Sequence, residues 1–300
     1  CIQGMKVVVL SDLRPKALSS AVSKLSEIYS NTSVVGYVCD VTNETSIKNL
    51  LSLIVQNFPK IPIRFLSANA GVLFPKSTIL SGIKEEWDTT YKVNVIGLAL
   101  TLKTFVDYML KQDVESCVEI TASSAGVING GTGPYGTSKH AALAIAEGLH
   151  GELFVRGLTN KIHLVVLCPA IVKTALRKTS LKVAEATRSV GSRGAVGSRI
   201  ISMEARDEDA SSVGAVMMFE TNWSQGMSAK YCAKEVMNCL KNGKFYCILD
   251  NEVERDGFVG TAGRDPGHAS GIGGITKAGS AICKTHHHVG GGWPTSKIKF

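Results

Sequence analysis

Hydrophobic and polar positions follow two alternating patterns over the first 250 residues. Short apolar runs rich in Val, Ile, Leu and Cys, such as KVVVLSD and IHLVVLCPA, predict buried strands. Longer stretches with apolar residues three and four apart predict amphipathic helices. The expected strands are 6–12, 33–41, 63–71, 116–124, 162–170 and 245–249. The expected helices between them are 14–29, 43–58, 85–110, 135–155 and 228–241.

Regular alternation of strands and helices predicts an α/β fold, with helices covering both faces of a parallel sheet. We therefore expect a Rossmann-like, doubly wound parallel sheet in a single domain. The composition changes near Asp256, because residues 257–300 are rich in Gly and His and poor in Leu. The expected organisation is one domain over 1–256 and a Gly/His-rich tail over 257–300.

The composition excludes several classes of protein. With 44% hydrophobic and 19% charged residues among 300, the chain is globular rather than disordered. It has no apolar run of about 18 residues, so we expect no membrane span. The net charge of +8 is spread out instead of forming a basic stripe with aromatics, which argues against nucleic-acid binding. The eight scattered cysteines contain no CxxC and predict reduced thiols in the cytoplasm.

The chain starts at Cys1 and not at Met, and no secretory hydrophobic region precedes the first expected strand. We expect no signal peptide. A start of this kind suggests a fragment, a processed product or an imperfect gene model.

The segment PYGTSKHA at 134–141 carries the sharpest chemical signal. Tyr135 and Lys139 stand four apart, so on a helix they share a face and the ammonium would favour the phenolate. A free phenol is a poor base at neutral pH, and a neighbouring positive charge corrects this. Ser123 lies at the end of an expected strand, where ligands bind in open α/β sheets. Its hydroxyl could hold a substrate oxygen beside the phenol.

Several motifs occur in an order that resembles the short-chain dehydrogenase/reductase family, over roughly residues 4–250. They are LSDLRP at 10–15, CDVT at 39–42, ANAG at 68–71, NVIG at 94–97, ITASSAG at 120–126, YGTSK at 135–139 and CPAIVKT at 168–174. The chain departs from the family at Ala68, where Asn is usual, and at Ala170, where Gly is usual.

The resemblance implies a catalytic role for four residues. Tyr135 would exchange a proton with the substrate oxygen while hydride moves to or from a nicotinamide. Lys139 would lower the pKa of Tyr135 and hydrogen-bond the nicotinamide ribose, and Ser123 would orient the substrate oxygen. Asn94 would hold a water that links Lys139 to solvent. Without the family, the favoured reading of Asn94 is a buried polar group satisfied by the backbone.

The resemblance also implies a binding site for NAD. Asp40 would meet the adenine and Asn69 the adenosine ribose, although Asp40 could instead be a charge at a helix N-terminus. Val172 and Thr174 would hold the carboxamide, although Thr174 could be a turn residue. The remaining residues implied in cofactor binding are Asp12, Val41, Ala70, Gly71, Tyr135, Lys139 and Pro169.

Asp12 bears on the choice of cofactor. A carboxylate at the end of its strand accepts hydrogen bonds from the ribose hydroxyls and repels a 2′-phosphate, which favours NAD over NADP. Arg14, two residues on, leaves NADP as an alternative.

Three glycines with the spacing G-x-x-x-G-x-G, Gly267, Gly271 and Gly273, lie near the end of the chain. The family carries such glycines after its first strand, where backbone amides hold a pyrophosphate. Here the first βα unit is missing from the start of the chain or permuted to its end. Circular permutation, a rearranged sequence and a coincidental Gly-rich tail all remain open.

The leading expectation is an NAD-dependent alcohol dehydrogenase or ketone reductase acting on a small molecule. A catalytically silent dinucleotide-fold protein with a structural or regulatory role is the alternative. Residues between Thr174 and Met227 are expected to cover the substrate, and the helices at 85–110 and 135–155 to form a homodimer or homotetramer. We expect no metal site, because the adjacent histidines 286–288 have no ligand pair with zinc-like spacing.

Overall fold

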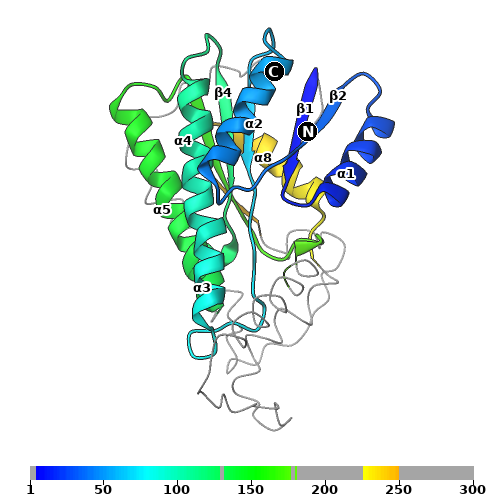
Figure 1. Ribbon diagram of the computed structural model, residues 1–300. Helices are drawn as coiled ribbons and strands as arrows, with labels where there is room; N and C mark the ends of the chain where they lie inside the picture. The colour runs from blue at the N-terminus through cyan, green and yellow to red at the C-terminus, as the bar shows by residue number, and fades with distance from the viewer. Residues whose placement is uncertain (1–4, 129–131, 177–179, 181–225, 250–300) are drawn as a thin grey trace, which may run out of the picture.

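The computed structural model describes residues 5–128, 132–176, 180 and 226–249 (Figure 1). Its strands are β1 (Val7–Asp12), β2 (Ser33–Val38), β3 (Phe65–Ala68), β4 (Ser116–Thr121), β5 (Ile162–Pro169) and β6 (Tyr246–Leu249). Its helices are α1 (Pro15–Ile28), α2 (Glu44–Asn57), α3 (Lys84–Tyr91), α4 (Leu98–Met109), α5 (Gly133–Val155) and α8 (Ala229–Lys241). Every expected element is present, but β2, β3, β4 and β5 end one to three residues earlier than expected.

Local chemistry explains where several helices begin. Pro15 opens α1, where its fixed φ suits the first helical turn. Asn43 caps α2, and its side-chain oxygen accepts hydrogen bonds from Thr45 N at 2.9 Å and Ser46 N at 3.2 Å. Ser228 caps α8 in the same way, accepting from Tyr231 N at 3.1 Å.

The single long helix expected over 85–110 is interrupted. Between α3 and α4 the structure has a π-helical turn, Lys92–Gly97. At Gly97 the helix passes close to the loop after β2, so that a Cβ there would lie 2.9 Å from Cγ2 of Val41. Only glycine permits this approach without displacing a neighbour. The turn aims Asn94 into the protein, in keeping with the frequent occurrence of π-turns at functional sites.

The strands are parallel, as expected, but the expectation of one continuous sheet is wrong for the described residues. β1 pairs with β2, and β3, β4, β5 and β6 form a second sheet in that order. Within the described ranges β1 and β3 each have one edge without a partner strand. The break in strand pairing, between β1 and β3, falls where the family that the sequence resembles has its first strand and helix. The glycines at 267, 271 and 273, which would supply it if the chain is circularly permuted, lie outside the described residues.

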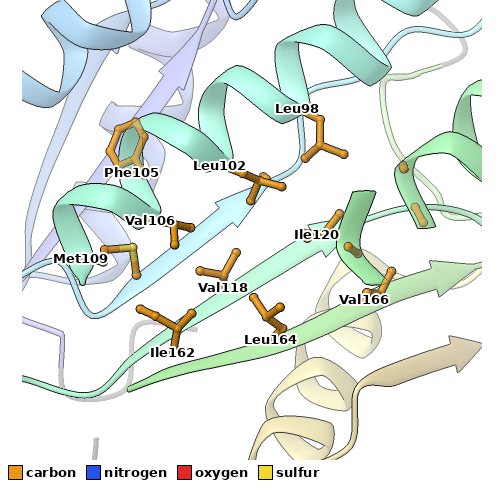
Figure 2. Close-up of a cluster of buried hydrophobic side chains, with 14 of the residues drawn as sticks. Leu98, Leu102, Phe105, Val106, Met109, Val118, Ile120, Ile162, Leu164 and Val166 are labelled. Atoms are coloured by element: carbon orange, nitrogen blue, oxygen red, sulfur yellow. The ribbon is translucent and has the colours of Figure 1, made fainter. Parts of the chain in front are cut away.

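The main core lies between the larger sheet and the α4–α5 side of the protein. Figure 2 shows side chains of α4 meeting those of β4 and β5. The labelled members are Leu98, Leu102, Phe105, Val106, Met109, Val118, Ile120, Ile162, Leu164 and Val166. A second cluster, which includes Val165, Leu167, Cys232 and Val236, joins α8 to the opposite face. These two layers fix the ends of β4 and β5 relative to the start of α5.

Candidate active site

Ser123 and Tyr135 meet where β4 gives way to α5. Ser123 follows the strand and begins a short 3-10 turn, its hydroxyl accepting a hydrogen bond from Ala125 N at 3.2 Å. Tyr135 lies in the first turn of α5, and its phenol is hydrogen-bonded to Ser123. Both side chains are 7% exposed. The structure thus brings the expected proton carrier and the expected substrate-orienting hydroxyl into contact.

The pKa of Tyr135 differs from the expectation. Burial of the phenol raises its pKa, and the hydrogen bond with Ser123 opposes this increase only in part. The expected lowering by Lys139 is therefore not what this structure gives. A low-dielectric surrounding disfavours the phenolate, and this effect dominates here.

Lys139 lies one helical turn beyond Tyr135, with its Nζ 5.8 Å from the centre of the phenol ring. It is 5% exposed, and its Nζ donates a hydrogen bond to the main-chain oxygen of Thr121 at 2.7 Å. Burial lowers the pKa of Lys139 to about 8, while the neighbouring Glu119 and Cys168 act in the opposite direction. The ammonium is therefore the charged form at neutral pH.

Gly126 explains how α5 comes so close to the end of β4. A Cβ on Gly126 would lie 2.6 Å from the main-chain oxygen of Lys139, nearer than real Cβ contacts occur. The glycine of the S-x-x-G motif is thus required by packing and sets the distance between Ser123 and Lys139.

Asn94 joins three segments around this cluster. Its side-chain oxygen accepts from Val72 N at 2.8 Å, and its amide group donates to Val72 O at 3.0 Å and to Ser138 Oγ at 2.9 Å. A Cβ on Gly71 would lie 3.5 Å from Asn94 Oδ1 and 3.6 Å from Lys139 Nζ. The structure supports the reading of Asn94 as a buried amide satisfied by its neighbours. Its role in holding a water for Lys139 stays a prediction.

Asp12 ends β1 on the smaller sheet, and both of its carboxylate oxygens are bound by Arg14. Oδ1 accepts from Arg14 N at 2.8 Å and Nε at 3.0 Å, and Oδ2 accepts from Nη2 at 3.0 Å. The hydrogen bond from the Arg14 side chain holds the pKa of Asp12 below its usual value. The residue expected to meet the ribose is therefore a carboxylate already paired with a cation.

Asp40 and Asn69 lie in the loops after β2 and β3. Asp40 Oδ1 accepts from Thr42 N at 2.9 Å and from Thr42 Oγ1 at 2.8 Å, which forms a local turn directly before the α2 cap. Asn69 is exposed, with its Oδ1 3.1 Å from Thr121 Oγ1. Ala70 is exposed beside it. Contacts of these residues with an adenosine remain predictions.

The end of β5 carries the residues expected to hold a carboxamide. Pro169 is the last residue of the strand, and Val172 makes a parallel bridge with Met227. Thr174 Oγ1 accepts from Leu176 N at 3.3 Å, so Thr174 is a turn residue here, as its alternative reading proposed. The expected substrate-covering segment lies mostly outside the described residues, as do the histidines at 286–288.

Two functional candidates were not predicted from the sequence: Glu119 and Thr121, which stand on β4 just before Ser123. Glu119 is 4% exposed and accepts hydrogen bonds from Ser67 and Thr121. A glutamate inside the otherwise apolar run SCVEIT was the signal available. In the part of the chain that is described, no group of three His, Cys, Asp or Glu side chains could hold a metal ion. No helix there is long and apolar enough to cross a bilayer.

Comparison with known proteins adds to this geometry. Residues 2–184 match the family model described as short chain dehydrogenase, a match that includes none of the glycines at 267–273. Short-chain dehydrogenase reductase 3b of Arabidopsis thaliana is 35% identical over 124 residues, which are 41% of this chain and 47% of that protein. Secoisolariciresinol dehydrogenase of Forsythia intermedia is 31% identical over 141 residues, which are 47% of this chain and 49% of that protein. The chain spans about half the length of these curated relatives.

Solved structures share the fold at lower identity. A short-chain dehydrogenase/reductase from Burkholderia phymatum in complex with NAD aligns with a TM-score of 0.65 and 24% identity, over 85% of this chain and 88% of that one. Levodione reductase aligns with a TM-score of 0.60 and 18% identity, over 83% and 88%. These alignments show an α/β Rossmann-like architecture.

Proposed function

Because the chain belongs to the short-chain dehydrogenase family, we propose that it is a nicotinamide-dependent oxidoreductase that interconverts an alcohol and its ketone, with Tyr135 as general acid and base. The observation that carries the proposal is the buried contact of Ser123 with Tyr135, with Lys139 one turn away. Such a group can move one proton to or from a substrate oxygen out of contact with water. The nicotinamide, when bound, supplies the hydride.

The buried ammonium of Lys139 is suited to binding a nicotinamide cofactor. An ammonium has three hydrogen-bond donors, and among the described residues Lys139 Nζ donates to one acceptor, Thr121 O. A buried cation with unused donors is suited to ribose hydroxyls. Gly71 leaves room beside it, since a Cβ there would come within contact of both Asn94 Oδ1 and Lys139 Nζ.

The proton transfer follows from the same contacts. In ketone reduction the Tyr135 phenol donates its proton to the substrate oxygen, while Ser123 holds that oxygen in place. The Lys139 ammonium, 5.8 Å from the centre of the ring, attracts the negative charge of the resulting phenolate. The charge of Lys139 therefore offsets the burial that keeps the resting phenol protonated. In alcohol oxidation the same steps run in reverse.

The choice between NAD and NADP depends on Asp12 and Arg14. The Asp12 carboxylate supports NAD, because it would repel a 2′-phosphate. Arg14 neutralises that carboxylate in the unliganded chain, which weakens the repulsion. We therefore assign NAD as the preferred cofactor, with NADP as the competitor to be measured beside it.

The spacing of Gly267, Gly271 and Gly273 supports these glycines as a cradle for the diphosphate, although they lie outside the described residues. A version of the chain cut after Asp256 tests this assignment. Loss of dinucleotide binding on truncation supports it. Binding that survives truncation would remove these glycines from the site.

A homo-oligomer formed through the expected helices is supported by apolar side chains on their surface. Ile96 is 53% exposed in the π-turn before α4, and Phe154 and Val155 are 61% and 84% exposed at the end of α5. Burial of such side chains favours association. Light scattering of the purified chain measures the number of subunits directly.

The function is tested first by titrating the chain with NADH and NADPH and following nicotinamide fluorescence, then by assaying a panel of ketones and secondary alcohols. Tyr135→Phe should retain cofactor binding and lose turnover. Tyr29→Phe, a change of the same kind at the C-terminal end of α1, is the matched control. Turnover in Tyr135→Phe at the wild-type rate would refute the proposed role.

A further inference from the structure

A buried carboxylate lies beneath the proposed catalytic group and takes no part in the proton transfer described above. Glu119 is on β4, two residues before Thr121, so these two side chains leave the strand on the same face, and Ser123 follows just after the strand ends. Its strand neighbours are Ser67 on β3 and Val165 on β5. An ionised group in this central strand is costly unless it is hydrogen-bonded and balanced by an opposite charge.

Hydroxyl groups satisfy both of its oxygens. Ser67 Oγ donates to Oε2 at 2.5 Å, and Thr121 Oγ1 donates to Oε1 at 2.7 Å. The single hydroxyl hydrogen of Thr121 is best placed on this short contact, because Asn69 Oδ1 is farther away, at 3.1 Å. The amide of Asn69 can then turn its NH₂ group toward Thr121. Two donors aimed at one carboxyl group favour its ionised form.

Thr121 connects this carboxylate to the catalytic lysine. Its hydroxyl contacts Glu119, and its main-chain oxygen accepts the hydrogen bond from Lys139 Nζ at 2.7 Å. Thr121 therefore binds the Glu119 carboxylate through its side chain and the Lys139 ammonium through its main chain. Burial raises the pKa of Glu119, and the hydrogen bonds from Ser67 and Thr121 and the charge of Lys139 oppose this increase. The charge of Glu119 in turn opposes the lowering of the Lys139 pKa by burial.

The other groups around the pair leave Glu119 as the principal source of negative charge near Lys139. On β5, Cys168 faces Lys139, but burial raises the pKa of its thiol to about 12, so it is neutral at working pH. On α5, Tyr135 is held protonated by burial, and the amide of Asn94 carries no charge. Ser67 and Thr121 face Glu119 as neutral hydroxyls.

We propose that Glu119 is a positioning residue, which acts through Thr121 to hold the Lys139 side chain in place and keep its ammonium charged beside Tyr135. The inference deepens the proposed function and rests on it for its catalytic meaning. The charge balance itself is a property of the folded chain and can be measured without substrate.

The experiment follows the protonation of Lys139 directly. Protein labelled with ¹³C-lysine is titrated with alkali, and the Cε resonance of Lys139 is assigned by its absence from Lys139→Met. Glu119→Gln, nearly the same size and able to accept the same hydroxyl hydrogen bond, should lower the titration midpoint of Lys139 by about 1–3 pH units, the usual effect of losing one close opposite charge. Glu152→Gln, an exposed change on α5, should leave it unchanged.

A second variant separates charge from packing. Thr121→Val removes the hydroxyl but retains the main-chain oxygen that binds Lys139, and it should give a smaller fall of the midpoint. If Glu119→Gln does not fold, Glu119→Asp and Thr121→Val replace it in the test. Glu119→Asp retains the negative charge, so its Lys139 midpoint should lie nearer the wild-type value than the midpoint in Thr121→Val does. An unchanged Lys139 midpoint in folded Glu119→Gln, or in Thr121→Val where the glutamine variant is lost, overturns the inference.

Activity is a separate readout. If the wild type turns over ketones, the pH at which kcat/KM declines should fall in Glu119→Gln together with the NMR midpoint. A shifted NMR midpoint in a chain without dehydrogenase activity would uphold the charge balance and refute the proposed function. Dehydrogenase activity together with an unshifted Lys139 midpoint would uphold the proposed function and refute the charge balance.

Discussion

The side-chain amide of Asn94 closes a pair of hydrogen bonds with the main chain of Val72, accepting from its N at 2.8 Å and donating to its O at 3.0 Å. The same amide reaches Ser138 on α5. A π-turn, the loop after β3 and the helix that bears Tyr135 are thereby joined at one buried residue. The position of the proposed proton carrier depends on this joint.

Replacing Asn94 with Ala should destabilise the protein by about 1–3 kcal/mol, because buried polar groups of Val72 and Ser138 lose their partner. Urea denaturation followed by circular dichroism measures the change. Asn57→Ala is a suitable control, since its amide bonds Leu53 O at the exposed end of α2. Equal stability of the two variants would contradict the role given to Asn94.

Two glycines near or within α5 should respond in opposite directions to the same substitution. Gly126→Ala should cost about 1–3 kcal/mol, because its Cβ would meet the backbone at Lys139. Gly148→Ala should stabilise the chain by up to about 1 kcal/mol, because alanine favours a helix and nothing lies within 4 Å of the new methyl group. Thermal unfolding of both variants checks the pair, and a tolerated alanine at 126 would show that α5 can move away from β4.

The rate of ketone reduction should decline as pH rises through about 8. Burial lowers the pKa of Lys139 to that value, so its charge is present below pH 8 and lost above it. Tyr135 has a raised pKa and stays protonated over the same range. The measurement is kcat/KM for the ketone between pH 6 and 10. Any activity left in Lys139→Arg should lack this decline, and a flat wild-type profile up to pH 10 would contradict the assignment.

Removing the Asp12 carboxylate should shift the cofactor preference toward NADPH. Asp12→Ser frees Arg14 from its ion pair, so that the guanidinium can meet a 2′-phosphate. A gain of one charge-assisted contact is worth about tenfold in the ratio of the two dissociation constants. Fluorescence titrations with NADH and NADPH measure that ratio. Arg14→Gln should move it the other way, and a ratio unaffected by either change would place the adenosine elsewhere.

Thiol reagents should distinguish the six described cysteines by their surroundings. Burial raises the pKa of Cys117 and of Cys168 to about 12, which makes them poor nucleophiles. Cys239 is only partly buried, and its hydrogen bond with Cys247 lowers its pKa. Iodoacetamide at pH 8 followed by mass spectrometry should therefore modify Cys239 before the other two. Faster modification of Cys117 would mean that β4 is accessible to reagent.

Periodicity and order of motifs were enough to predict the strands, the helices and the parallel pairing. The contact of Ser123 with Tyr135 also followed from a strand end and a helix face. The division of the sheet did not, because strand pairing is a long-range property that local pattern leaves open. The role of Glu119 was not predicted for a similar reason. It depends on contacts with two hydroxyls and an ammonium that come from three separate elements, and a local stretch of sequence does not show that these groups meet.

The pKa of Tyr135 shows a further limit. Spacing four apart on a helix places a lysine near a phenol, but it carries no information on how deeply both are buried. Solvent exclusion disfavours every charged form and here outweighs the hydrogen bond with Ser123, so the pKa of Tyr135 is raised. Depth within the fold comes only with tertiary packing.

The divided sheet also has a mechanical consequence. Asp12 ends a strand on one side of the division, and Asn69 and Gly71 follow a strand on the other. A dinucleotide that contacted both strand ends would link the two sheets, which share no strand pairing in the described part of the chain. Binding would then stabilise the smaller sheet against unfolding. The temperature at which β1 and β2 unfold would rise with cofactor concentration more steeply than the unfolding temperature of the core around α4 and β4.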